Sequence, residues 1–433
     1  MMIRARKREG EKEIGHKALL KCILGAISVI LIILLIRPVL SEYYASISEI
    51  KEDNLLRASR ITGEDARYHY LLGLLYYSPY YSPHNKSGIE KAIDRYLLSL
   101  KRNPTDAHAW IAIARAYRDS GMWKHAEYAI RKAVYMNKNS PALIWESGVF
   151  FLLGDKSVEA TKLLKRYIHM VPDDQENVYS LFYSMKVEPV YVLDNLLPWE
   201  QAFYKRYLNF LITNKLLSES FELWRRMKSF TPERADYITY CNFLIETGEI
   251  KDALTLWDDF VGKFGVRTDQ SQPEAIWNGD FELPIENGGF DWRVGKADGV
   301  KVFIDRDIRR TGYTSLSANF DGKHNPGVYL TEQIVPVESG KMYKVIGYIK
   351  TENVTTKNGI FLDVAGYRCD PFVKRTESVT GTNLWKNMEL EFTAPGNCKA
   401  IKIGIGRERS EKFDNKIGGD VWIDSMAMTS IKN

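Results

Sequence analysis

The sequence predicts a multi-domain chain: an N-terminal transmembrane helix, then an all-α segment of helical repeats, then a C-terminal all-β sandwich. An uncharged apolar run fills residues 22–36. Apolar residues then recur with the period of a helix as far as residue 265, and short alternating runs begin after Gln272-Pro273. Because 433 residues exceed what one hydrophobic core supports, two or three folded units are expected.

The charge distribution excludes nucleic acid as a partner. The formal net charge is +5, and apolar and charged residues make up 45% and 27% of the chain, an ordinary globular balance. Much of the positive charge lies in the first 21 residues, at Arg4, Arg6, Lys7, Arg8, Lys12, Lys17 and Lys21. A nucleic-acid-binding protein instead spreads basic residues over one face of a folded domain.

The apolar run predicts a membrane anchor at 18–40, preceded by a basic cytoplasmic segment at 1–17. Such a run is long enough to cross roughly 30 Å of hydrocarbon. The positive-inside rule places the N-terminus in the cytoplasm. The predicted localisation is therefore the inner (cytoplasmic) membrane, single-pass, with the bulk of the chain periplasmic. A cleaved signal peptide is the alternative, although Pro38 and Leu40 form a poor cleavage site.

After a connector at 41–64, residues 65–265 are predicted to form helical repeats. The clearest unit runs from Ala107 to Lys138, with large and small residues alternating at helical spacing. These residues are Trp110, Ala114, Tyr117, Gly121, Ala126, Ile130 and Ala133. The unit resembles a tetratricopeptide repeat, a resemblance that implies a groove for a protein partner. The alternative is that the helices act only as a spacer.

Residues 266–273 are predicted to be a linker, and 274–433 a β-sandwich. Apolar residues spaced by two recur in six runs and should face the core. The runs are Val300/Val302/Ile304, Leu316/Ala318/Phe320, Val345/Gly347/Ile349, Ile360/Leu362/Val364, Met388/Leu390/Phe392 and Ile401/Ile403/Ile405. A segment of this size holds the strands of a jelly roll.

An ordered set of motifs adds a family resemblance for the sandwich. The set includes Asn278-Gly279-Asp280-Phe281-Glu282, Gly312-Tyr313-Thr314-Ser315-Leu316, Phe392-Thr393-Ala394-Pro395 and Val421-Trp422-Ile423-Asp424. It resembles the galactose-binding-like jelly-roll family, which includes carbohydrate-binding modules. The resemblance implies a glycan ligand and a structural Ca²⁺ at Glu282 and Asp424, supplemented by carbonyls or Asn278. The alternative is that these acids cap turns or pair with basic side chains.

The sugar-binding face is predicted from strand alternation. If the apolar series points inward, the intervening residues point outward, where exposed aromatic rings suggest a binding site. The candidates are Tyr329, Gln333, Tyr348, Phe361, Asp363, Tyr367 and Arg368. Rings stack on the C–H face of a pyranose, and the polar groups bond its hydroxyls. Alternatively, some of these rings lie under a loop or against the helices.

Cys369 and Cys398 are candidates for a disulfide in an oxidising compartment. Whether they lie close enough to pair is left open by the sequence.

No catalytic motif is present, so a binding protein is expected and not an enzyme. The predicted function is a membrane-anchored scaffold whose repeats dock a protein and whose jelly roll binds a glycan, in assembly or export of surface polysaccharide. One alternative is a purely structural scaffold whose jelly roll binds protein. The other is a glycoside hydrolase, which needs two carboxyl groups facing each other across a cleft.

Overall fold

A computed structural model describes residues 27–43 (except 29, 33 and 34), 51–79, 86–264, 276–413 and 415–431. The chain divides into two compact units, Met1–Pro198 and Trp199–Asn433. The second unit thus contains the last four helices together with the sandwich. The predicted basic segment at 1–17 and the predicted linker at 266–273 lie outside the described residues.

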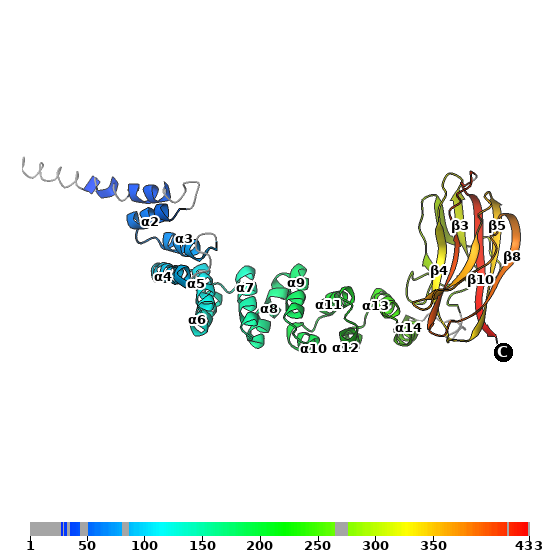
Figure 1. Ribbon diagram of the computed structural model, residues 1–433, viewed down its shortest axis with the longest axis horizontal. Helices are drawn as coiled ribbons and strands as arrows, with labels where there is room; N and C mark the ends of the chain where they lie inside the picture. The colour runs from blue at the N-terminus through cyan, green and yellow to red at the C-terminus, as the bar shows by residue number, and fades with distance from the viewer. Residues whose placement is uncertain are drawn as a thin grey trace, which may run out of the picture. The chain divides into compact units, whose positions relative to one another are not determined.

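The first unit is helical (Figure 1). Its helices are α2 (Glu52–Ile61), α3 (Ala66–Tyr77), α4 (Lys86–Arg102), α5 (Ala107–Asp119), α6 (Trp123–Met136), α7 (Pro141–Leu153), α8 (Ser157–Met170), α9 (Gln175–Ser184) and the short α10 (Pro189–Tyr191). A 3-10 turn at Pro172–Asp174 and a π turn at Val192–Leu196 complete it. Pairs of consecutive helices pack as hairpins, and each hairpin contacts the next.

Caps and glycines explain these hairpins. The Asp106 carboxylate accepts the N–H groups of His108 and Ala109 and so begins α5. Gly148 lies where α7 meets α8, and a Cβ there would be 2.6 Å from Leu164. Only glycine permits this approach. The predicted all-α segment is confirmed, whereas the tetratricopeptide type of the repeat stays a prediction.

The predicted transmembrane helix at 18–40 is corrected by the structure. Across the described ranges, no helix combines the length and the apolar character needed to cross a bilayer. Residues 18–26, 29, 33 and 34 of that segment lie outside those ranges. Just after the predicted segment, the Oγ of Ser41 accepts a hydrogen bond from the Tyr68 hydroxyl of α3 at 3.1 Å. The finding overturns the predicted transmembrane helix and the single-pass inner-membrane localisation derived from it.

The second unit begins with two helical hairpins. Their helices are α11 (Gln201–Thr213), α12 (Leu217–Met227), α13 (Arg234–Thr247) and α14 (Ile250–Phe264). A capping box of Glu233 and Asp236 starts α13, and Gly248 ends it at φ 89°, in the left-handed region. Both ends of α13 are therefore fixed by the local sequence.

The sandwich consists of two five-stranded antiparallel sheets (Figure 1). Sheet A has the order β1-β4-β9-β6-β7, and sheet B has the order β2-β3-β10-β5-β8. The strands are β1 (Arg293–Val294), β2 (Val300–Asp305), β3 (Ser315–Asp321), β4 (Val328–Pro336), β5 (Met342–Val354), β6 (Phe361–Tyr367), β7 (Val373–Arg375), β8 (Gly381–Thr393), β9 (Ala400–Arg407) and β10 (Gly418–Ile431).

The predicted alternation describes the core well. All six apolar series contribute side chains to one buried cluster between the sheets or pack against it. Ile304, at the end of β2, is the exception, because it is exposed. The predicted all-β sandwich is therefore confirmed, and the outer face of each sheet follows from the residues between the core positions.

Candidate functional site

On the outer face of sheet A, polar and aromatic side chains surround the central strand β9, which has glycine at positions 404 and 406. Arg293, Glu332, Gly404, Asp363 and Arg375 are register partners across β1, β4, β9, β6 and β7, so they lie on one side of the sheet. We call this side the sheet A face. Its members are Arg293, Tyr329, Glu332, Phe361, Asp363, Tyr367, Arg375, Lys402, Gly404 and Gly406.

Two glycines in β9 make room for the Tyr329 ring. A Cβ on Gly404 would lie 2.6 Å from Cε1 of Tyr329, and a Cβ on Gly406 would lie 2.9 Å from its Cδ1. The ring therefore lies across β9, in space that any other residue would fill. This gives the sheet A face a fixed aromatic surface at its centre.

The Tyr329 hydroxyl is bound to a buried acid. It donates to Oδ2 of Asp363 at 2.8 Å, and Nη2 of Arg375 donates to the same oxygen at 3.1 Å. Asp363 is buried, and Arg375 also pairs with Glu408 at 2.5 Å. Burial raises the pKa of Tyr329 to about 12, and the Asp363 carboxylate acts in the same direction. The hydroxyl therefore stays protonated and remains a donor at neutral pH.

Cations cover parts of both aromatic rings. The Arg375 guanidinium lies 3.7 Å from the centroid of the Phe361 ring, which is only 4% exposed. Lys402 Nζ lies 4.9 Å from the Tyr329 centroid and 3.2 Å from a Glu332 carboxylate oxygen. The Phe361 ring thus packs against the Arg375 guanidinium and is almost fully buried, whereas the Tyr329 ring is half-buried.

The structure brings Tyr329, Phe361, Asp363 and Tyr367 together, and it separates Gln333 and Tyr348 from them. Gln333 points into the sandwich, where its side chain bonds the main-chain N–H and C=O of Trp277 at 3.0 and 2.7 Å.

Tyr348 also lies apart from this group, whereas Arg368 directly follows Tyr367 and its charge acts on the Tyr367 hydroxyl. Tyr348 belongs to sheet B, where the Arg310 guanidinium lies 3.5 Å from its ring centroid. Arg368 follows β6 and is exposed, with a positive φ of 55°.

Sequence reasoning missed Arg293, Glu332, Arg375 and Lys402. Arg375 lies on a three-residue exposed strand with no alternation to reveal it. Arg293 lies on a strand of two residues. The sequence pattern could have revealed Lys402, because Lys402 lies between the core residues Ile401 and Ile403 of β9.

Two of the predicted calcium ligands, Glu282 and Asp424, accept hydrogen bonds from the main chain of the 310–314 turn. Glu282 Oε1 accepts the N–H groups of Tyr313 and Thr314 at 2.5 and 3.0 Å, and Asp424 Oδ2 accepts those of Arg310 and Thr311 at 2.7 and 3.1 Å.

Asn278 bonds the main chain of Leu283 instead of joining these two carboxylates. In this arrangement the three side chains satisfy protein donors and do not form the set of six to eight oxygens that Ca²⁺ takes. Over the described part of the chain, no group of three His, Cys, Asp or Glu could hold a metal. Calcium binding stays a prediction.

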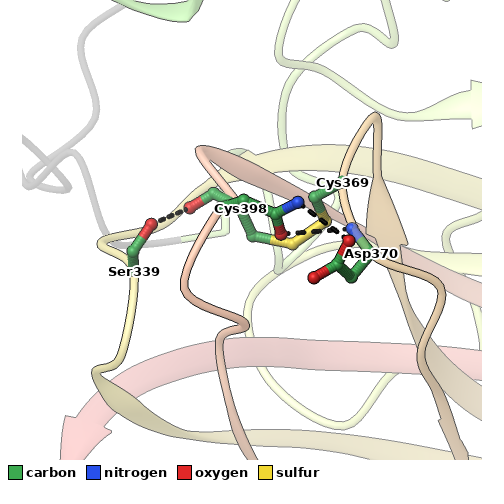
Figure 2. Close-up of a disulfide and its surroundings, with 5 residues drawn as sticks. Ser339, Cys369, Asp370 and Cys398 are labelled. Carbon is green, nitrogen blue, oxygen red and sulfur yellow. Dashed lines mark hydrogen bonds between the residues drawn. A yellow bond between two sulfur atoms is a disulfide. The ribbon is translucent and has the colours of Figure 1, made fainter.

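Cys369 and Cys398 form a disulfide, with their Cα atoms 5.0 Å apart (Figure 2). The bridge joins the turn after β6 to the turn before β9. Asp370 and Asn397 bond each other beside it, and Ser339 Oγ donates to the Cys398 carbonyl at 2.8 Å. The turn that follows Tyr367 is thereby fixed.

The chain matches no protein-family model and no curated protein. Its β-sandwich is similar to solved carbohydrate-binding modules. The xylan-binding domain CBM22-1 from Paenibacillus barcinonensis Xyn10C is 13% identical over 36% of this chain and 93% of its own, with a TM-score of 0.25. TmCBM61, solved in complex with β-1,4-galactotriose, is 19% identical over 38% of this chain and 100% of its own, with a TM-score of 0.25.

A bacteriophage protein is also similar. Tailspike protein 4 of bacteriophage CBA120 is 15% identical over 37% of this chain, with a TM-score of 0.27, and the match spans 22% of the tailspike chain. At these identities the likenesses concern the fold and assign no ligand to this chain.

Proposed function

We propose that this chain is a non-catalytic glycan-binding scaffold: the sheet A face binds the glycan and the helices dock a protein. The observation that carries the proposal is the Tyr329 ring held across Gly404 and Gly406, with Asp363 and Arg375 at its hydroxyl. A pyranose has an apolar C–H face and a rim of hydroxyls. A fixed ring beside charged hydrogen-bonding groups complements both features.

The pairing of the acids favours binding over hydrolysis. Asp363 pairs with Arg375, and Glu332 pairs with Lys402 at 3.2 Å. Each of these carboxylates is thus held by a basic side chain, whereas a glycoside hydrolase needs two carboxyl groups that face each other across a cleft. The ion pairs therefore support a binding surface.

The helices offer a groove for the protein partner. A cavity of about 400 Å³ opens among α6, α7 and α8, lined by apolar side chains, four cations and one acid. The lining residues are Arg131, Val134, Tyr135, Lys138, Phe151, Glu159, Lys162, Leu163 and Arg166. We call it the α6–α8 groove. Its excess of cations around apolar side chains fits an acidic peptide with apolar anchors.

Tetratricopeptide-type repeats in residues 65–265 and a role in assembly or export of surface polysaccharide belong to this proposal. The pathway rests on the combination of helices and sandwich in one chain, an inference by analogy. A scaffold whose sandwich binds protein instead is the alternative.

The test is binding of the full chain to a panel of polysaccharides by affinity electrophoresis and titration calorimetry. Tyr329→Ala is expected to weaken binding about 10-fold, because stacking and a charge-assisted hydrogen-bond network are both lost. Tyr329→Phe keeps the ring and should lose less. The matched control is Tyr313→Ala, since Tyr313 is 79% exposed on the 310–314 turn. Binding to no glycan, or equal binding by Tyr329→Ala and wild type, would overturn the proposal.

A further inference from the structure

A cleft separates helix α13 from the sheet A face. It encloses a cavity of about 430 Å³ within the second unit. Helix α13 lines it with Asn242, Ile245 and Glu246. The sandwich lines it with Arg293, Glu332, Ile334, Ala365, Gly366, Tyr367 and Lys402. Four of these sandwich residues, namely Arg293, Glu332, Tyr367 and Lys402, belong to the sheet A face defined above, so the cleft is continuous with the proposed glycan site.

Helix α13 is held at this position by specific contacts. Asn242 Oδ1 accepts the Gly289 N–H at 2.8 Å and Nη2 of Arg293 at 2.9 Å. Arg293 Nη2 also donates to the Gly289 carbonyl at 2.8 Å. In the same hairpin, the Trp257 ring packs edge-on against Trp277, with centroids 5.5 Å apart. The helix is thus a fixed wall of the cleft.

Hydrogen-bonding capacity is left over in this cleft. Nη1 of Arg293 is buried and has no hydrogen-bond partner among the described residues. A buried donor without a partner costs free energy, so the protein alone does not satisfy this guanidinium. Burial, followed by the Glu246 carboxylate, raises the pKa of Tyr367, so its hydroxyl is a donor at neutral pH. Glu246 is exposed on α13 and supplies only acceptors.

The charges indicate the kind of ligand. Two cations, Arg293 and Lys402, and two acids, Glu246 and Glu332, line the cleft, so its formal charge is balanced. Donors and acceptors from opposite walls together suit hydroxyl groups, because each hydroxyl both donates and accepts. Lys402 pairs with Glu332, whereas Glu246 has no ion pair among the described residues, so a carboxylated sugar next to α13 would face repulsion from Glu246.

We infer that α13 forms the second wall of the glycan site and that Glu246 contacts hydroxyls of a neutral sugar unit there. The inference rests on the proposed function of the sheet A face. The ligand site is then formed by residues of both the α13–α14 hairpin and the sandwich. Specificity for neutral over carboxylated glycans then comes in part from the helix.

The test compares Glu246→Gln with Asp258→Asn in the full chain. Asp258 is an exposed acid on the neighbouring helix α14 and lies outside the cleft, so both changes remove one carboxylate. The probes are a neutral polysaccharide that wild type binds and its carboxymethylated form. Glu246→Gln should weaken binding of the neutral polysaccharide about 10-fold, since a charge-assisted hydrogen bond is lost. Carboxymethylation should weaken wild-type binding more than binding by Glu246→Gln, and Asp258→Asn should behave as wild type.

The outcomes separate this inference from the proposed function. If Glu246→Gln matches wild type on both probes while Tyr329→Ala loses binding, α13 is not part of the site, although the sheet A face is. If wild type binds no glycan, the proposed function itself is wrong. Circular dichroism checks that each variant is folded.

Discussion

At the scale of single residues, Asp291 is a fully buried acid just before β1. Its Oδ2 accepts the Glu286 N–H at 2.6 Å, and its Oδ1 has no hydrogen-bond partner in the described ranges. Burial raises the pKa of Asp291 from 3.8 to about 7. The folded chain therefore binds a proton at this carboxyl more tightly than the unfolded chain does.

Asp291 predicts a stability that falls with rising pH. Its contribution is fully present below about pH 4 and is lost as the pH rises through about 7. Between pH 5 and 8.5, the free energy of unfolding should fall by about 2–3 kcal/mol. Urea denaturation at both values, followed by near-UV circular dichroism, measures this. Asp291→Asn should remove most of the fall, and the exposed Asp298→Asn should not. Equal falls in wild type and Asp291→Asn would contradict the assignment.

Four of the seven predicted sugar-face residues share the sheet A face, and the misplacement of Gln333 has a definite cause. Strand β4 contains an irregularity between Tyr329 and Thr331, where one extra residue opposes β9. Such a bulge shifts the side-chain phase by one, so Gln333 turns inward and Glu332 turns outward. No glycine or proline marks this position, and alternation alone could not reveal it.

At the scale of elements, the sequence does not show which of the two sheets each strand joins. Alternation tells which residues of a strand face the core, but both sheets face the same core. Strand β5 pairs with β10 and β8, so Tyr348 lies on the opposite outer face from Tyr329. Which sheet a strand joins depends on long-range pairing, which a single sequence does not display.

The α6–α8 groove carries a prediction at this scale. Lys162→Glu together with Arg166→Glu should abolish binding of an acidic peptide with apolar anchors, because attraction becomes repulsion. Fluorescence anisotropy of a labelled peptide of Glu, Leu and Phe measures this, with a Lys-substituted peptide for comparison. The control pair, Lys101→Glu with Arg102→Glu at the end of α4, lies outside the groove. Equal binding by both charge reversals would show that the groove is not the docking site.

At the scale of the whole molecule, the boundary between units was not visible in the sequence. The spacing of apolar residues changes from helical to alternating at Gln272-Pro273, yet α11 to α14 belong to the same compact unit as the sandwich. The cause lies in contacts that sequence periodicity cannot show. Gly289 has a φ of 59°, and a Cβ there would lie 2.2 Å from the Trp257 ring.

Gly289→Ala should therefore loosen the hairpin of α13 and α14 from the sandwich. Both the positive φ and the clash with Trp257 oppose the methyl group, and a loss of stability of about 1–3 kcal/mol is expected. Hydrogen–deuterium exchange should rise in α13 and α14 and stay unchanged in α3 to α8. Gly262→Ala is the control, because nothing lies within 4 Å of a Cβ there. Unchanged exchange in Gly289→Ala would show that the contact does not hold the hairpin.

The Trp257 contact also decides how the sandwich can be studied as a separate fragment. A fragment that starts at residue 276 would lose the α14 ring that packs on Trp277 and on Phe290, at 5.5 and 6.1 Å between centroids. Those rings would then meet water and make the fragment prone to self-association. It would also lack one wall of the cleft. A fragment that begins at Trp199 keeps both, so weak binding by the shorter piece would reflect where it was cut.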